Sequence, residues 1–279
     1  MQLLSRLHPV ALILAAIVSV QLGAAIAKSL FATVGPGGTV FLRVGFAALI
    51  LAFAWRHSLR QFRRADWPLA GLFGLVLGLM NLTFYYALQH LPLGLTVTIE
   101  FIGPLSVALW HSRRLLDLVW VALAATGIAL LNPLSGKLDY LGLTLAVCAG
   151  GLWAAYIVLG ARLGRRLPGG VGLAAAMLAA TAVAAPVGAP AVVSILEHPL
   201  VLLAGFGVAI LSSVLPYSFE IEALRRLPER VFGILMSIEP AVAALVGWLI
   251  LGETLSLNQW LAIGAVMAAS YGATRYSQG

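Results

Sequence analysis

The chain has 279 residues, of which 61% are hydrophobic and only 10% are charged, and its mean hydropathy is +1.01. A soluble globular domain needs about 25% charged residues to cover its exterior, so this composition excludes a soluble protein. It predicts an all-α membrane protein. The single cysteine excludes an intrachain disulfide. The formal net charge of +7 would suit a nucleic-acid or acidic-lipid partner, but its distribution along the chain indicates a topology signal instead.

Apolar runs of about 20 residues, separated by short Arg, Gly and Pro clusters, predict membrane helices rather than barrel strands, which would alternate with period two. Ten transmembrane helices are predicted, and their connections are too short for a soluble domain. They cover residues 9–32, 37–55, 67–89, 93–111, 117–133, 140–161, 169–189, 199–223, 230–250 and 257–274.

The first predicted helix has a second interpretation. The triplet AIA at 25–27 resembles the cleavage site of a secretory signal, which would remove this segment from the mature protein. The apolar run is long for a signal, and its removal would leave nine spans, so we expect a membrane helix.

Basic residues are divided very unequally between the two sets of connections. One set holds fourteen Lys and Arg residues, and the other holds Lys137 alone. The positive-inside rule therefore predicts that both termini are cytoplasmic.

An internal repeat is visible at an offset of 136 residues. YALQHLP at 86–92 aligns with EALRRLP at 222–228, Pro104 aligns with Pro240, and Asp117 aligns with Glu253. Five helices per copy is an odd number, so the second copy would be inverted relative to the first, as in many secondary transporters. We expect two five-helix repeats, residues 1–136 and 137–279.

Ionisable residues at membrane depth are the first candidates for a functional site, because a charge at the bilayer centre costs about 2.5 to 3.5 kcal/mol on insertion scales. They are Lys28, Arg43, Glu100, Glu220 and Glu239. Their placement suggests that Arg43 pairs with Glu100. Two structural interpretations stay open: Lys28 can snorkel to the outer interface, and the Arg43–Glu100 pair can be purely structural.

Two prolines sit next to these charges. Pro104 has no N–H for the carbonyl of Glu100, and Pro240 likewise frees the carbonyl of Met236. A carboxylate beside a free carbonyl suits an ammonium group or a proton, whereas a kink satisfied by Ser106 or Ser237 is the structural alternative.

Polar residues at helical spacing complete the candidates. Asn81 and Tyr85 are four residues apart, while Tyr217 with Glu220 and Trp153 with Tyr156 are three apart, so each pair shares a helix face. The small residues GAAIA, AGG at 149–151, and Gly74 with Gly78 are expected to allow close helix packing.

Enzyme chemistry has no support in the sequence. It contains neither H-E-x-x-H nor a serine elbow, and its five histidines fall at or beyond the ends of the predicted spans. We expect no catalytic residues, no metal site and no cofactor.

Several stretches resemble the drug/metabolite transporter superfamily of EamA type, and within it the bacterial threonine/homoserine exporters. The segment FGILMSIEPAVAALVGWLILGETL at 232–255 is typical of the superfamily. GAAIAKSLF at 23–31, MNLTFYYALQHLPLGLTVTIEFIGPLSVAL at 80–109, LWAAYI at 152–157 and LPYSFE at 215–220 are similar to the exporter branch.

The resemblance implies an efflux carrier of the bacterial inner membrane for small neutral amino acids. It also implies a central cavity lined by the first four helices of each half, with the fifth and tenth helices peripheral. The expected substrate-binding residues are Lys28, Arg43, Asn81, Tyr85, Glu100, Tyr156, Tyr217, Glu220 and Glu239.

A zwitterion needs an anion for its ammonium group and a cation for its carboxylate, and the predicted membrane core offers both. We therefore expect an amino-acid substrate and proton antiport, with Glu100 or Glu239 carrying the proton, because burial favours the neutral form of a carboxyl group. The alternatives are export of other metabolites or drugs, or a membrane sensor or structural protein that transports nothing. The oligomeric state is left open.

Overall fold

The computed structural model describes residues 7–59, 62–110, 115–130, 139–167, 170–224, 226–227 and 229–276. All regular structure in these residues is helical. Seven of the helical stretches are long and apolar enough to cross a membrane. The chain is therefore a multi-pass α-helical membrane protein.

The helices follow the predicted apolar segments. In chain order they are α1 (Pro9–Ser29), α2 (Phe31–Ala54), α3 (Arg56–Leu59), η2 (Arg64–Asp66), α4 (Trp67–His90), α5 (Leu93–Glu100), α6 (Ile102–Trp110), α7 (Leu115–Leu130), α8 (Tyr140–Arg166), α9 (Val171–Gly188), η3 (Ala189–Ala191), α10 (Val192–Glu197), α11 (Pro199–Ala209), η4 (Ile210–Val214), α12 (Leu215–Leu224), α13 (Glu229–Met236), α14 (Glu239–Leu251) and α15 (Leu257–Tyr276). The seven span candidates leave out α5 with α6, α7 and α15, so the count of ten spans stays a prediction.

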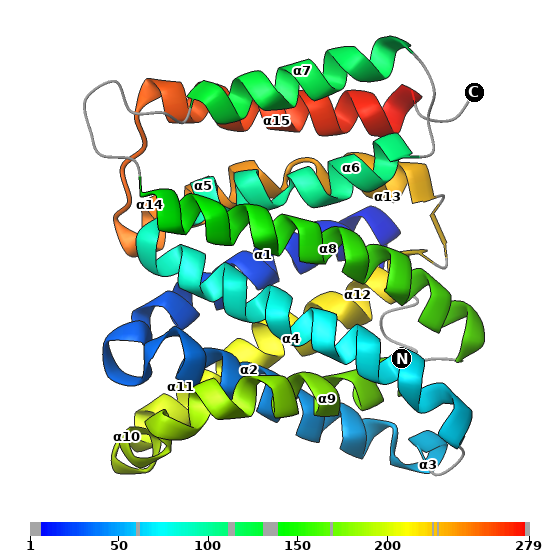
Figure 1. The fold of residues 1–279 in the computed structure, drawn as a ribbon, viewed down its shortest axis with the longest axis vertical. Helices are drawn as coiled ribbons and strands as arrows, with labels where there is room; N and C mark the ends of the chain where they lie inside the picture. The colour runs from blue at the N-terminus through cyan, green and yellow to red at the C-terminus, as the bar shows by residue number, and fades with distance from the viewer. Residues whose placement is uncertain are drawn as a thin grey trace.

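Helix α1 runs through the middle of the bundle, and α7 lies beside α15 at one edge (Figure 1). The start of α1 and the end of α15 lie on the same side of the molecule (Figure 1). Which side of the membrane this is remains a prediction from the distribution of Lys137 and the arginines. The position of α1 fits a membrane helix that belongs to the folded protein.

Helices α4 and α8 pack antiparallel and are joined by an ionic contact at each end. His90 Nδ1 lies 2.8 Å from Asp139 Oδ2 at one end, and Arg166 Nε donates to Asp66 Oδ1 over 2.7 Å at the other. Asp139 also accepts from the Gly142 N–H over 2.9 Å and so caps the start of α8. These contacts fix the register of α4 against α8.

Four interruptions break the membrane helices. Gly35 adopts φ 66° within α2, a conformation that favours glycine, so the predicted VGPGG connection is a kink there. The helix also breaks after Glu100, where α5 ends, and before Glu239, where α14 begins. The fourth interruption is η4, a π-helical turn between α11 and α12. Such turns occur frequently at functional sites.

Close packing at Gly74, Gly78 and Gly150 confirms the predicted role of these small residues, whereas a Cβ on Gly151 would meet nothing within 4 Å. A Cβ atom on Gly74 would collide with the Ala176 carbonyl of α9, and one on Gly78 would lie 3.0 Å from the Val183 Cβ. A Cβ on Gly150 would lie 2.8 Å from the carbonyl oxygen of Glu100. Glycine at 150 therefore lets α8 pack directly against the break that carries Glu100.

Candidate functional site

A cavity of about 850 Å³ lies between the two halves of the chain. Its wall is formed by α1, α2, α4, α5 and α6 from the first half, and by α8, α9, η4, α12, α13 and α14 from the second. This agrees with the expectation of four helical segments from each half. Helix α15 is less peripheral than expected, since Ser270 and Thr274 also line the cavity.

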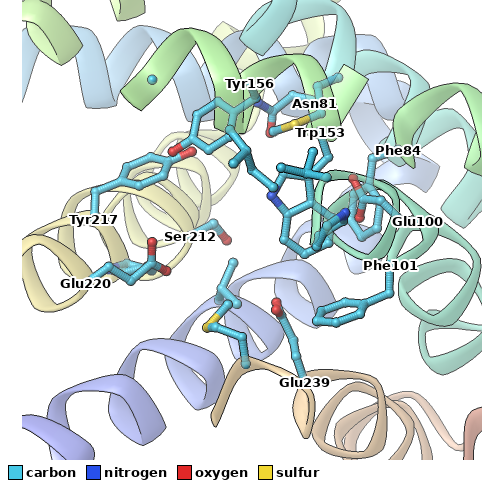
Figure 2. A pocket seen from close by; sticks show the side chains of 18 of the residues that line it. Asn81, Phe84, Glu100, Phe101, Trp153, Tyr156, Ser212, Tyr217, Glu220 and Glu239 are labelled. Carbon is cyan, nitrogen blue, oxygen red and sulfur yellow. The ribbon is translucent and has the colours of Figure 1, made fainter. Parts of the chain in front are cut away.

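Seven of the nine predicted binding residues line this cavity. They are Arg43, Asn81, Glu100, Tyr156, Tyr217, Glu220 and Glu239. Figure 2 shows six of them, all but Arg43, around a common space. Charged and polar groups from distant parts of the sequence therefore converge on one chamber.

Arg43 is the basic residue of the described cavity wall, and three acceptors hold its guanidinium in place. Its Nε donates to Ser213 Oγ over 3.2 Å, Nη1 to Tyr85 Oη over 3.2 Å, and Nη2 to the Ser212 carbonyl over 2.8 Å. The π-helical turn η4 supplies two of these acceptors. A guanidinium has five N–H donors, so two stay available for an anionic ligand.

Glu239 stands at the first position of α14, after the break at Ser237 and Ile238. Its Oε1 accepts a hydrogen bond from Gln21 Nε2 on α1 over 3.0 Å. Its Oε2 has no partner in the described part of the chain, and neither has Gln21 Oε1. This carboxylate is thus only partly satisfied.

Glu100 and Glu220 face the cavity from opposite halves (Figure 2). Within the described ranges, neither side chain makes a hydrogen bond or an ion pair. The cavity therefore brings three carboxylates together with the guanidinium of Arg43.

Aromatic side chains form the rest of the wall. Tyr156 stacks on Phe73 with ring centroids 5.0 Å apart and lies 6.3 Å from the ring of Tyr217. The Trp153 ring meets Phe101 edge-on at 5.4 Å. An apolar wall with a few charged groups is the usual composition of a small-molecule site.

The predicted ion pair between Arg43 and Glu100 is wrong. Among the described residues, the ion pairs with N–O distances within 4.0 Å do not include these two. The guanidinium is held instead by Tyr85 and η4. The carbonyl of Glu100 packs toward Gly150, so the suggested pocket of carboxylate and free carbonyl gains no support there.

The two remaining predicted residues lie outside the cavity wall. Tyr85 is fully buried behind Arg43 and positions it through the hydrogen bond of its hydroxyl group. Lys28 Nζ instead donates to Glu253 Oε1 over 2.7 Å and to the Leu91 carbonyl over 2.9 Å. Direct substrate contacts by these two side chains stay a prediction.

The Lys28–Glu253 pair lies at the end of the bundle where α5 begins. Glu253 Oε2 accepts from the Leu93 N–H over 2.7 Å, so both oxygens are used and α1, α5 and α14 are tied together. The cavity extends from the middle of the bundle away from this pair. Its wall follows α8 from Trp153 to Leu167, toward the end where Arg166 contacts Asp66.

Sequence reasoning missed Gln21, Ser212 and the partner of Lys28. Gln21 and Ser212 both line the cavity. The signal for Gln21 was a glutamine within an apolar run. The signal for Glu253 was its alignment with Asp117 in the internal repeat. The π-helical turn that presents Ser212 leaves no mark in hydrophobic periodicity.

The hydrogen-bond donors and acceptors of the cavity wall suit a small zwitterion. Carboxylates can accept from an ammonium group, and the spare N–H groups of Arg43 can donate to a carboxylate. Groups of three or more His, Cys, Asp or Glu side chains placed to hold a metal are absent from the described residues.

Comparison with known proteins gives concordant matches. The family model described as "EamA-like transporter family" matches residues 8–132 and 140–275. The threonine/homoserine exporter RhtA of Escherichia coli (strain K12) is 46% identical over 270 residues, which cover 95% of this chain and 91% of that protein. RhtA of Salmonella typhimurium (strain SL1344) matches to the same extent. A crystal structure with a TM-score of 0.61 and 20% identity covers 96% of this chain and 98% of its own, which shows a common fold.

Proposed function

The chain belongs to the EamA-like transporter family, and we propose that it exports small neutral amino acids such as threonine and homoserine by proton antiport. Its location would be the bacterial inner membrane, with both termini cytoplasmic. The substrate class rests on the 46% identity to exporters of that name. The antiport rests on the chemistry of the cavity.

The observation that carries the proposal is the pairing of charges in one cavity. Arg43 supplies a positive group and Glu100, Glu220 and Glu239 supply negative groups around about 850 Å³. Small-molecule sites occupy roughly 300–1,000 Å³, so a four-carbon amino acid and some water fit. A purely cationic or apolar cargo would leave the guanidinium without a role.

The two halves are proposed to be inverted repeats that rock about the cavity. The two separate stretches matched by the family model, 8–132 and 140–275, support a duplication with a boundary near residue 136. The helix breaks after Glu100 and before Glu239 occupy corresponding places in the two halves.

Glu100 and Glu239 are the proposed proton carriers. Both lie at helix breaks, and both line the cavity. Since burial and neighbouring like charges disfavour an ionised carboxylate, a proton can neutralise either group when no substrate is present. Outward movement of substrate would then be coupled to inward movement of protons.

Counterflow in proteoliposomes with labelled amino acids tests the substrate class. We expect uptake against preloaded homoserine or threonine, and little with aromatic amino acids or nucleobases. A signal with cationic drugs alone would favour the other exporters, and no flux of any solute would favour a sensor or structural protein.

The coupling assignment has a separate test. Exchange driven by a pH gradient should lose its pH dependence in Glu100→Gln or Glu239→Gln proteoliposomes. If both variants keep the pH dependence of the wild type, neither residue carries the proton.

A further inference from the structure

Gln21 is buried at mid-helix in α1, with 2% of its surface exposed. Its Nε2 group donates to Glu239 Oε1 over 3.0 Å. With Glu239 ionised, the state that would bind a cationic group, its carboxylate can only accept, so the NH2 group of the amide faces Glu239 and the carbonyl oxygen Oε1 faces elsewhere.

Two acceptor atoms remain without a partner on this pair. Gln21 Oε1 and Glu239 Oε2 are both buried, and neither has a hydrogen-bond partner in the described part of the chain. Both residues line the cavity. Buried polar atoms in folded proteins are nearly always hydrogen-bonded, so these two acceptors at the cavity wall point to a donor that comes from the cavity.

The chemistry of the two atoms favours one kind of donor. One is a neutral amide oxygen and the other a carboxylate oxygen, so water can donate O–H groups to both, but a donor that also carries a positive charge gains the attraction of the carboxylate. A primary ammonium group has three donors and no acceptor. A structural tie between α1 and α14 would need only the existing bond.

We propose that Gln21 and Glu239 together form the subsite that binds the ammonium group of the substrate, with Gln21 as a specificity-determining residue. The inference rests on the proposed function, since it requires an amino acid in the cavity. It goes further by assigning the two ends of the ligand: the ammonium group lies at α1 and α14, and the carboxylate lies toward Arg43 on α2.

The surroundings of Arg43 agree with this polarity. Ser212 presents its carbonyl to Arg43 Nη2 over 2.8 Å, and its hydroxyl Oγ is buried without a partner among the described residues. Ser212 Oγ packs against Gly23 of α1, where a Cβ atom would collide with it. A hydroxyl can donate as well as accept, so Ser212 can add a donor next to the guanidinium of Arg43.

The test compares two ligands that differ only in the amino group. Homoserine and 4-hydroxybutanoate compete with labelled homoserine for binding to the purified full-length protein in nanodiscs. For the wild type we expect homoserine to bind far more tightly. In Gln21→Met, which keeps the length of the side chain and removes both polar atoms, the affinity for homoserine should fall roughly 10- to 100-fold, and that for 4-hydroxybutanoate should change little.

The ratio of the two affinities separates a ligand contact from a packing effect, because damage to the fold weakens both ligands together. Gln21→Asn keeps the amide but shortens it, and should show the same loss of discrimination if Gln21→Met does not assemble. Thr39→Val is the matched control: Thr39 is buried, bonds to the Gly35 carbonyl within α2, and does not line the cavity.

Three results would overturn the inference. An unchanged ratio in both Gln21 variants would leave the proposed function intact and remove Gln21 from the site. A defect present only in sodium buffer would mean that these oxygens hold Na⁺ instead. If the wild type binds no amino acid, the proposed function and this inference both fail.

Discussion

The two ends of α14 carry glutamates that both contact α1. They differ in how many of their carboxylate oxygens have a hydrogen-bond partner. Glu253, just past the end of the helix, uses one oxygen for Lys28 and the other for the Leu93 N–H. Glu239, at the start of the helix, uses one oxygen for Gln21 and leaves the other unpaired. A carboxylate with both oxygens engaged holds helices together, whereas one with a spare oxygen at a cavity can still bind a ligand.

The backbone conformation at each end of α14 positions the glutamate there. Gly252 takes φ 67°, and the Glu253 N–H donates to the Gly247 carbonyl over 3.1 Å, which ends α14 in a glycine cap. A Cβ atom on Gly247 would lie 2.5 Å from Glu253 Oε2, so this glycine makes room for the carboxylate. At the other end, Pro240 lies in the first turn of α14, where its missing N–H costs no helical hydrogen bond.

The largest effect on transport is expected from Glu239→Gln, which tests directly whether Glu239 differs from Glu253 in binding a ligand. The substitution removes the charge that faces the ligand and keeps the size of the side chain, so homoserine counterflow should fall about 100-fold. The apparent melting temperature should stay close to that of the wild type. A variant that transports normally would place Glu239 with Glu253 among the structural carboxylates.

A double-mutant cycle on Lys28→Met and Glu253→Gln tests the opposite end of α14. Each single change leaves one partly buried member of the pair without its ionic partner. Each should therefore destabilise the protein by about 1 to 3 kcal/mol. The double variant should lose less than the sum, as measured by thermal unfolding in detergent. Transport should fall less than in Glu239→Gln.

Additive losses in that cycle would show that the two side chains act separately. Loss of homoserine binding in Lys28→Met at unchanged stability would instead restore Lys28 as a direct substrate ligand, as the sequence suggested.

An effect of similar size on stability is expected near Glu100, where the first half has its own helix break. Gly150→Ala adds a methyl group 2.8 Å from the Glu100 carbonyl, which should cost about 1 to 3 kcal/mol of stability through overpacking and lower the rate of counterflow. Gly151→Ala is the adjacent control, because a Cβ there meets nothing within 4 Å. Equal behaviour of the two variants would mean that the position of Glu100 does not depend on α8.

The smallest effect concerns Asp139, at the same end of the bundle as Glu253. The hydrogen bond from the Gly142 N–H, and then the one with His90, lower the pKa of Asp139 below its ordinary value of 3.8. Because the pKa is lower in the folded state, this carboxylate stabilises the fold above pH 3.8 and loses that contribution as the pH falls further.

Melting temperatures from pH 3 to 7 check this sign. Asp139→Ala should melt slightly below the wild type at neutral pH, and the difference should shrink in acid. Homoserine counterflow at neutral pH should not change, and a large transport defect would connect this exposed contact to the cavity.

The charged residues of the cavity wall could be predicted from the sequence for one physical reason. Charges such as Arg43 and Glu239 are costly in lipid, so they had to face the protein interior, and helix periodicity placed Tyr217 and Glu220 on a common face. Gln21 was missed because an uncharged amide costs less free energy to bury in the membrane than a charge does. Its presence in an apolar helix therefore does not by itself indicate a functional site.

Partners far apart in the chain could not be derived from local patterns. Lys28 and Glu253 are 225 residues apart, and only the packing of α1 on α14 shows that they meet. The expected Arg43–Glu100 pair failed for the same reason, since depth along a helix does not reveal that Tyr85 and the π-helical turn already surround the guanidinium.

The π-helical turn has a mechanical consequence for the protein. A π-turn contains one residue more than the same turn of α-helix, so η4 stores an extra residue between α11 and α12. If that residue were released, α12 would rotate relative to α11 by about 100°, the angle per residue of an α-helix. Tyr217 and Glu220 would then turn away from the chamber together, and Arg43 would lose its hydrogen bond to the Ser212 carbonyl.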